Sequence, residues 1–350
     1  MDETEESPGW HAIDRALEPL YPGVEPHHWG TLIKWVMGGP DPLDGISAYP
    51  RTDPVPHWHY ISYGMSELYD KDPEGDPDIS GWGFEFTFRL VRDPSETTPP
   101  VWAANLLQNL GRYVFTSGNW FEPGHHMDVN GPIAASRQDS AIRAIVFDED
   151  PELGTISTPH GRVRFLQVIG LATEEYEAAR AWNTMGLLEV LAPKIPLYVT
   201  DIDRTSLLSD PELAAAVQAG IERDGSSSGV LFVTTAQWER QDGATTLKLG
   251  ALQAPAIRRS LRGRLPFGRA LALQGQDGNL FFEPADTFSV RPGEGGLTIG
   301  VPDAALDSLI DAIRSEAGRV PVPALPGLTV EIIPTRLRDA YGRETGEVVG

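Results

Sequence analysis

The amino-acid sequence predicts an α+β fold of two lobes, each a mixed β-sheet with packed helices. In residues 81–90, phenylalanine and leucine alternate with polar side chains, which is the period-two pattern of a strand with one face in a core. The segment 57–69 is rich in aromatic and β-branched residues, and the polar loop 70–80 joins these two strands. A chain of 350 residues is longer than a single hydrophobic core usually accommodates. The glycine- and serine-rich stretch 224–229 is therefore the expected boundary between the lobes.

The first lobe is expected to span residues 8–226, with the other elements packed around the two aromatic strands. Apolar side chains at helical spacing, together with start and stop signals, predict helices at 10–20, 101–115, 173–191 and 210–223. Apolar runs rich in β-branched residues predict strands at 144–147, 163–171 and 198–201.

The second, smaller lobe is expected to span residues 229–335 and to consist mainly of short strands. One helix is predicted, over residues 303–317, from its four buried-face leucines and isoleucines. Residues 336–350 are charged and contain glycine, which predicts a flexible tail. The strands are expected at 230–235, 245–249, 268–274, 280–282, 297–301 and 328–333.

Composition limits the partners and the compartment. The formal net charge of −22 repels nucleic acid and anionic membrane surfaces, and it favours basic partners. The absence of cysteine excludes disulfides and thiolate metal sites. The acidic first residues have no apolar segment of a signal peptide, and nowhere do eighteen apolar residues run together, so we expect a cytoplasmic protein. The excess of arginine over lysine suggests a GC-rich bacterial genome.

No strong catalytic signature is present, so the sequence predicts no enzyme, no cofactor and no metal site. A Gly-x-Ser-x-Gly elbow, a dinucleotide loop and a phosphate loop are all missing. The alternative is a metalloenzyme. His57 and His59 lie two residues apart on one strand face, and His125 with His126 could supply further nitrogen ligands. Structural histidines that hydrogen-bond within the sheet are the simpler interpretation.

Several ordered blocks of sequence resemble the Suppressor of fused family. They extend from the N-terminus past residue 260, and a sparser similarity continues to the strand near residues 330–334. The blocks are GWHAI at 9–13, LYP at 20–22, GGPDPLD at 38–44, HWHYISYG at 57–64, GFEFTFRL at 83–90, RYVF at 112–115, FLQ at 165–167, GIERDGS at 220–226 and LRGRL at 261–265.

The resemblance implies a non-catalytic binding protein with a peptide-binding cleft between its lobes. Animal members clamp an extended peptide of Gli-type zinc-finger transcription factors and hold it in the cytoplasm. By position, Tyr113 matches a tyrosine of that groove, and the strand that begins at Val230 matches the edge of the second lobe. We therefore expect a partner-binding site formed by Tyr113, Trp120, His125 and Val230, where aromatic side chains supply contact area and strand edges supply main-chain hydrogen bonds.

Two departures from the animal pattern imply a different partner. His125 stands where the animal proteins have an aspartate that holds a histidine of the peptide, and an imidazole cannot replace that carboxylate. The acid-rich disordered insert is also missing, because only residues 250–267 separate two predicted strands. Bacterial members resemble immunity proteins. An alternative function is therefore toxin immunity, in which an acidic face shields a basic toxin.

Overall fold

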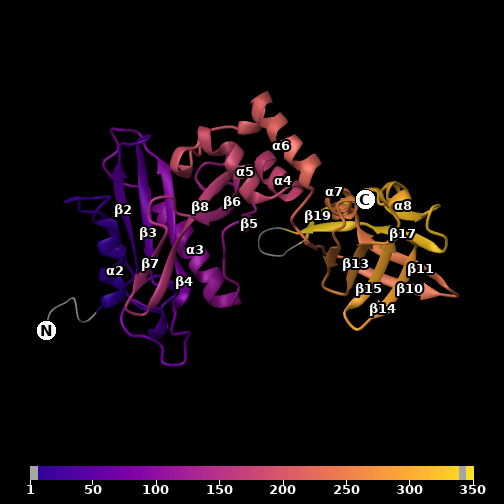
Figure 1. Cartoon of the computed structure of the whole chain (residues 1–350), viewed down its shortest axis with the longest axis horizontal. Helices are drawn as coiled ribbons and strands as arrows, with labels where there is room; N and C mark the ends of the chain where they lie inside the picture. Colours follow the sequence, from indigo (N-terminus) through magenta and orange to yellow (C-terminus); the bar gives the residue numbers. More distant parts are fainter. Residues whose placement is uncertain (1–6, 339–343) are drawn as a thin grey trace. The chain divides into compact units, whose positions relative to one another are not determined.

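The computed structural model describes residues 7–338 and 344–350 (Figure 1). The chain divides into two compact units, which confirms the predicted two-lobed α+β fold. The first unit comprises residues up to 176 together with 187–214, and the second comprises 177–186 together with 215–350. The segment 224–229, expected to separate the lobes, thus lies inside the second unit. Main-chain contacts hold it there, because Ser226 N donates to Gly263 O at 2.7 Å.

An eight-stranded sheet forms the centre of the first unit. Its strand order is β1-β2-β3-β4-β8-β6-β5, with β7 paired to β8, and only the β4–β8 pair is parallel. The strands predicted around residues 57–63 and 81–90 are adjacent and antiparallel, as expected, with Tyr60 opposite Phe88. The strands are β1 His27–Gly30, β2 Gly45–Arg51, β3 His57–Tyr63, β4 Ile79–Val91, β5 His126–Asp128, β6 Ile142–Glu149, β7 Thr155–Thr158 and β8 Gly161–Ala172.

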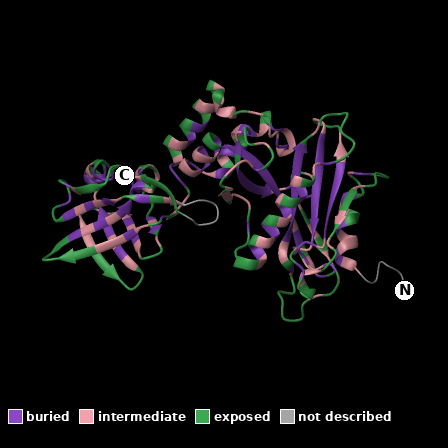
Figure 2. Cartoon of the chain, turned by 180° about the vertical axis from the view of Figure 1, so that it is seen from behind, coloured by how far each residue is buried: buried purple, intermediate pink, exposed green. Residues whose placement is uncertain are grey.

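Both faces of this sheet are covered (Figure 2). Helix α3 (Val101–Ser117) packs on one face, where Leu107 joins Trp58, Phe86 and Phe88 in a core cluster. Helix α2 (Pro8–Leu17) contributes to a second core cluster, which includes Phe165 of β8. The period-two pattern of β4 predicted one buried face, but its polar positions are buried as well.

The buried polar positions form a charged network on the face opposite α3. The side chain of Arg89 is fully buried and contacts Asp150 through two bonds, Nη1 to Oδ2 at 2.6 Å and Nη2 to Oδ1 at 3.1 Å. His59 Nε2 lies 3.2 Å from Asp150 Oδ2, and Tyr21 Oη donates to His59 Nδ1 at 2.6 Å. Burial is tolerated because every charge in the network faces an opposite charge or a hydrogen-bond partner.

The helical segment predicted over 173–191 is interrupted. Helix α4 (Thr173–Ala181) ends before α5 (Thr184–Leu191) begins, and Asn183 Oδ1 accepts from Gly186 N at 2.6 Å as a cap for α5. The strand predicted at 198–201 is reduced to a single bridge between Leu90 and Thr200.

The second unit contains a five-stranded sheet, a four-stranded sheet and a two-stranded ribbon. Their orders are β14-β15-β13-β12-β9, β10-β11-β17-β16 and β18-β19. Helix α6 (Pro211–Asp224) enters this unit, and α7 (Ala254–Arg264) and α8 (Asp303–Ala312) lie within it. The strands are β9 Val230–Phe232, β10 Ala236–Gln241, β11 Ala244–Gly250, β12 Leu271–Gln274, β13 Asn279–Pro284, β14 Ser289–Gly293, β15 Gly296–Val301, β16 Gly318–Pro321, β17 Leu328–Ile333, β18 Thr335–Arg338 and β19 Glu344–Val349.

Two features of this unit differ from the sequence-based expectation. Helix α7 was not predicted, although its buried residues Ala254, Ile257 and Leu261 have helical spacing, because four arginines dominate the segment. The segment expected to be a flexible tail forms β18 and β19 instead, and residues 339–343 between them lie outside the described ranges. Within those ranges, no helix has both the length and the apolar character that a membrane span requires.

Candidate functional site

Tyr113 lies on the last turns of α3 and combines a buried anchor with an exposed surface. Its ring stacks on Phe121 at 5.5 Å between centroids, and Phe121 stacks in turn on Phe147 of β6 at 4.1 Å. Nevertheless, 39% of the Tyr113 surface is exposed. A large aromatic side chain held in place by the core costs little entropy to bury again on binding.

Trp120 and His125 lie on the loop that follows α3. The side chain of Trp120 is 55% exposed, and its Nε1 lies 3.4 Å from Glu122 Oε1. His125 is exposed, and its Nδ1 accepts from Glu122 N at 3.3 Å. The carbonyl group of His125 accepts from Phe147 N at 3.0 Å, which attaches the loop to the sheet. Thus three of the four predicted site residues occupy one continuous stretch of the first unit.

This stretch leads into β5, a short strand at the end of the eight-stranded sheet. In the described part of the chain β5 pairs only with β6, where Met127 faces Ile145. An edge strand of this kind presents backbone donors and acceptors to which another strand can add.

Val230, the fourth predicted residue, belongs to the second unit and begins the edge strand β9. This strand runs parallel to β12, with Val230 opposite Ala272 and Phe232 opposite Gln274. Leu231 packs against the core, whereas Val230 and Phe232 are 45% and 76% exposed. Sequence reasoning did not single out Phe232, although the alternation of a strand places it on the same face as Val230.

A second exposed apolar surface lies elsewhere in the first unit. We call residues 32–37 the apolar loop. Leu32, Val36 and Met37 are among its strongly exposed side chains, and Leu32 reaches 101% exposure. The loop is fixed at Lys34, which lies 3.3 Å from Asp44 and 3.6 Å from the centre of the Tyr69 ring. Exposed apolar groups gathered in this way are typical of interaction surfaces.

The histidines of the metalloenzyme hypothesis do not meet. His57 and His59 are buried on β3, whereas His125 and His126 lie at β5, and strands β4, β8 and β6 separate them in the sheet. Burial lowers the pKa of His57 and of His59 to about 4, so both are neutral at physiological pH. Among the described residues, no group of three or more histidine, cysteine, aspartate or glutamate side chains is arranged to hold a metal ion.

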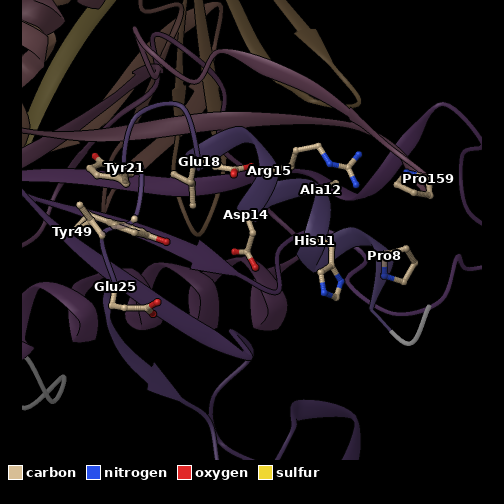
Figure 3. Close-up of a pocket in the computed structure, with 13 residues that line it drawn as sticks. Pro8, His11, Ala12, Asp14, Arg15, Glu18, Tyr21, Glu25, Tyr49 and Pro159 are labelled. Atoms are coloured by element: carbon tan, nitrogen blue, oxygen red, sulfur yellow. The ribbon is translucent and has the colours of Figure 1, made fainter. Parts of the chain in front are cut away.

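An acidic pocket of about 620 Å³ lies beside α2 in the first unit (Figure 3). Asp14, Glu18 and Glu25 contribute carboxyl groups to its lining, against the guanidinium group of Arg15. Partial burial raises the pKa of Asp14, while a 2.8 Å hydrogen bond from the Tyr63 hydroxyl group opposes that shift. The surplus of carboxyl groups suits a basic group of a partner.

Comparison with known proteins identifies relatives over much of the chain. Residues 39–205 match the family described as Suppressor of fused protein (SUFU). Over 239 residues the chain is 42% identical to the human Suppressor of fused homolog. This aligned region covers 63% of this chain and 49% of the human protein. The mouse homolog gives the same identity and coverage. The chain therefore spans about half the length of these curated relatives.

Solved structures agree with this similarity. The crystal structure of Drosophila Suppressor of Fused shares the fold, with a TM-score of 0.78 at 24% identity, and the match covers 93% of this chain and 97% of the Drosophila chain. A chain in the crystal structure of the Sufu-Fu complex is 36% identical, with a TM-score of 0.56, over 60% of this chain and 97% of that one. From sequence and fold together, this chain belongs to the Suppressor of fused family.

Proposed function

We propose that the chain is a non-catalytic binding protein that captures an extended segment of a partner protein and thereby sequesters or neutralises it in the cytoplasm. Its similarity to a chain solved in a Sufu-Fu complex supports a protein partner. The observation that carries the proposal is the open edge of β9, from which Val230 and Phe232 project.

Strand addition explains how such an edge would bind. An extended partner segment would satisfy the outer backbone groups of β9 by main-chain hydrogen bonds, which give affinity for almost any sequence. Phe232 and Val230 would contact alternate side chains of the segment, and this contact would give selectivity. The edge of β5 offers a second position of the same kind, next to Tyr113 and Trp120. We propose that both edges contribute to one interlobe cleft.

His125 would set part of the specificity. Its exposed imidazole precedes β5, where it can donate to a carboxylate or carbonyl group of the partner. A histidine-bearing peptide that needs an aspartate at this position would be a poor ligand. We therefore propose that the partner differs from the Gli-type factors bound by animal relatives.

The test starts by identifying chains that co-purify with the full-length protein from its native host, followed by calorimetric titration of the purified partner. Tyr113→Ala and Phe232→Ser are each expected to weaken binding by about 1–3 kcal/mol, the usual range for an aromatic anchor. Leu252→Ser is the matched control, because Leu252 is also an exposed apolar residue of the second unit but lies outside β9. Unchanged affinity in both Tyr113→Ala and Phe232→Ser would remove the two edges from the binding site.

The acidic pocket supports a second candidate function, immunity against a basic toxin. In this case Glu18 and Glu25, rather than the strand edges, would meet the partner. The double variant Glu18→Gln/Glu25→Gln is expected to weaken binding and to reduce its salt dependence, while Phe232→Ser leaves binding unchanged. A toxin reading frame next to the gene would favour this function. Unchanged binding in Glu18→Gln/Glu25→Gln together with weakened binding in Phe232→Ser would exclude it.

A further inference from the structure

Helix α7 carries an arginine stripe that its role in the core does not explain. Ala254, Ile257 and Leu261 form its buried face. Arg258, Arg259 and Arg262, which we call the arginine stripe, follow at helical spacing on another side of the helix. In a chain of net charge −22, three neighbouring arginines form an unusual local surplus of positive charge.

The stripe lines a concave site of about 610 Å³ that lies entirely within the second unit. Apolar side chains from three separate segments also line the site: Ala181 at the end of α4, Ile221 of α6 and Phe267. A volume of this size matches that of sites for small organic ligands, which typically combine apolar walls with a few polar groups.

The charges of the site are only partly balanced from within the protein. Arg259 forms an ion pair with Glu177, and Glu222 adds one carboxyl group to the lining. In the described part of the chain, Arg258 and Arg262 take part in no ion pair. The lining therefore keeps a surplus positive charge beside an apolar surface.

Close main-chain packing fixes the walls of the site. Gly225 has a φ of +63°, and an added Cβ there would lie 2.4 Å from both Gly263 O and the Phe267 ring. Arg264 Nη1 donates to Ser226 O at 2.8 Å, and Arg269 Nη1 donates to the same oxygen at 3.0 Å. Arg264 and Arg269 thus bind a backbone carbonyl group within the protein, whereas Arg258 and Arg262 remain available to a ligand.

We infer that this site binds a small organic anion, an aromatic or alkyl body that ends in a carboxylate or phosphate group. The body would lie against Ala181, Ile221 and Phe267, and the anionic group would meet the planar guanidinium groups of Arg258 and Arg262. Guanidinium groups recognise carboxylate and phosphate oxygens through paired hydrogen bonds, which ordinary surface lysines do not provide. This site is separate from the strand edges of the proposed function.

The test is calorimetric titration of the full chain with 2-naphthoate as the probe. Two further probes separate the contributions: 2-naphthalenemethanol keeps the apolar body without the charge, and inorganic phosphate keeps an anion without the body. Naphthoate is expected to bind with one-to-one stoichiometry and at least about tenfold more tightly than either control. The double variant Arg258→Gln/Arg262→Gln is expected to lose at least about tenfold in naphthoate affinity.

Two variants localise the binding. Arg240→Gln, at an exposed arginine of β10, is the matched control and is expected to bind naphthoate as the unchanged protein does. Ala181→Phe is expected to block the site, with circular dichroism to confirm that the variant is folded. Naphthoate affinity that persists in Arg258→Gln/Arg262→Gln, or that equals that of both control probes, would overturn the inference, as would normal binding to folded Ala181→Phe.

Discussion

The buried network around Arg89 leads to a prediction about stability that depends on pH. Replacing Arg89 by methionine keeps the length and apolar stem of the side chain but removes a fully buried guanidinium group. Asp150 loses its two contacts at 2.6 and 3.1 Å, and Glu152 loses one at 2.9 Å. Asp150 keeps a 2.9 Å hydrogen bond from Thr87 Oγ1, so its charge stays buried with fewer partners.

At pH 7.5 the loss is expected to be large. Removing one member of a buried ion pair usually costs 3–5 kcal/mol, because the other charge remains without compensation, and we expect about 4 kcal/mol for Arg89→Met. An exposed pair would lose far less, since water replaces the missing partner. The size of the effect therefore follows from the burial of Arg89 and Asp150.

His59 makes this cost depend on pH. Burial, and then the nearby charge of Arg89, lower the pKa of His59 from its ordinary 6.5 to about 4. Between these values the unfolded protein binds a proton that the folded protein does not, so wild-type stability falls as the pH decreases through this window. From pH 7.5 to pH 5 this loss is about 2 kcal/mol for one histidine.

In Arg89→Met the same histidine would gain a proton with a smaller loss of stability, because burial still lowers its pKa but the charge of Arg89 no longer does. The opposing charge of Arg89 is gone, and the carboxylate of Asp150 lies 3.2 Å from His59 Nε2, so the protonated imidazole restores a charge pair. The stability difference between wild type and variant is thus expected to be smaller at pH 5 than at pH 7.5, with His59 contributing up to about 2 kcal/mol to this change. His57 adds a change of the same sign, because its pKa is lowered first by burial and also by the charge of Arg89.

Urea denaturation followed by tryptophan fluorescence measures this difference, since seven of the nine tryptophans lie in the first unit. Arg240→Met, at an exposed arginine of the second unit, is the control and should change stability by less than about 0.5 kcal/mol at either pH. A stability difference that stays constant between pH 7.5 and pH 5 would refute the coupling of Arg89 to His59.

Two further substitutions test local packing. Glu85→Ala should lower the stability of the first unit by about 3 kcal/mol in urea denaturation, because it leaves several buried donors unpaired, among them Ser62 Oγ and Ser66 N. Glu74→Ala, at an exposed position, is its control, and equal losses would contradict the assigned role. Gly225→Ala should lower the melting temperature of the second unit more than Gly243→Ala. Both glycines have a positive φ, but only a Cβ at Gly225 meets other atoms. An equal shift would assign the cost to backbone strain alone.

The sequence pattern predicted the central strands well, because period-two alternation depends only on the local chain. Phe84, Phe86 and Phe88 share one face as expected. The same pattern could not indicate that the opposite face is buried, since this follows from Asp150 and Glu152, which arrive from a distant segment to neutralise Arg89. Helix α7 escaped prediction for a related reason. Its arginines resemble a solvated segment until α6 and the end of α4 pack beside them.

The candidate site was predictable in part. Tyr113 and Val230 were indicated by the resemblance to Suppressor of fused, and both have exposed surface as an anchor requires. Phe232 and the apolar loop were missed, because exposure of an apolar side chain cannot be read from a sequence in which most such side chains are buried. The sequence signal that could have indicated the apolar loop is the short apolar run at 32–37, which is followed directly by a turn rich in glycine and proline.

We expect stability and partner binding to depend on different residues in this chain. Arg89 and Glu85 are fully buried on a central strand, so their loss is expected to affect folding before it affects a binding surface. Phe232, Trp120 and Leu32 are exposed, and truncating them removes few contacts of the folded state. Because the two groups of residues do not overlap, a substitution at an exposed position that abolishes binding but leaves unfolding unchanged assigns that position to an interface. The same loss of binding in Arg89→Met would carry no such information.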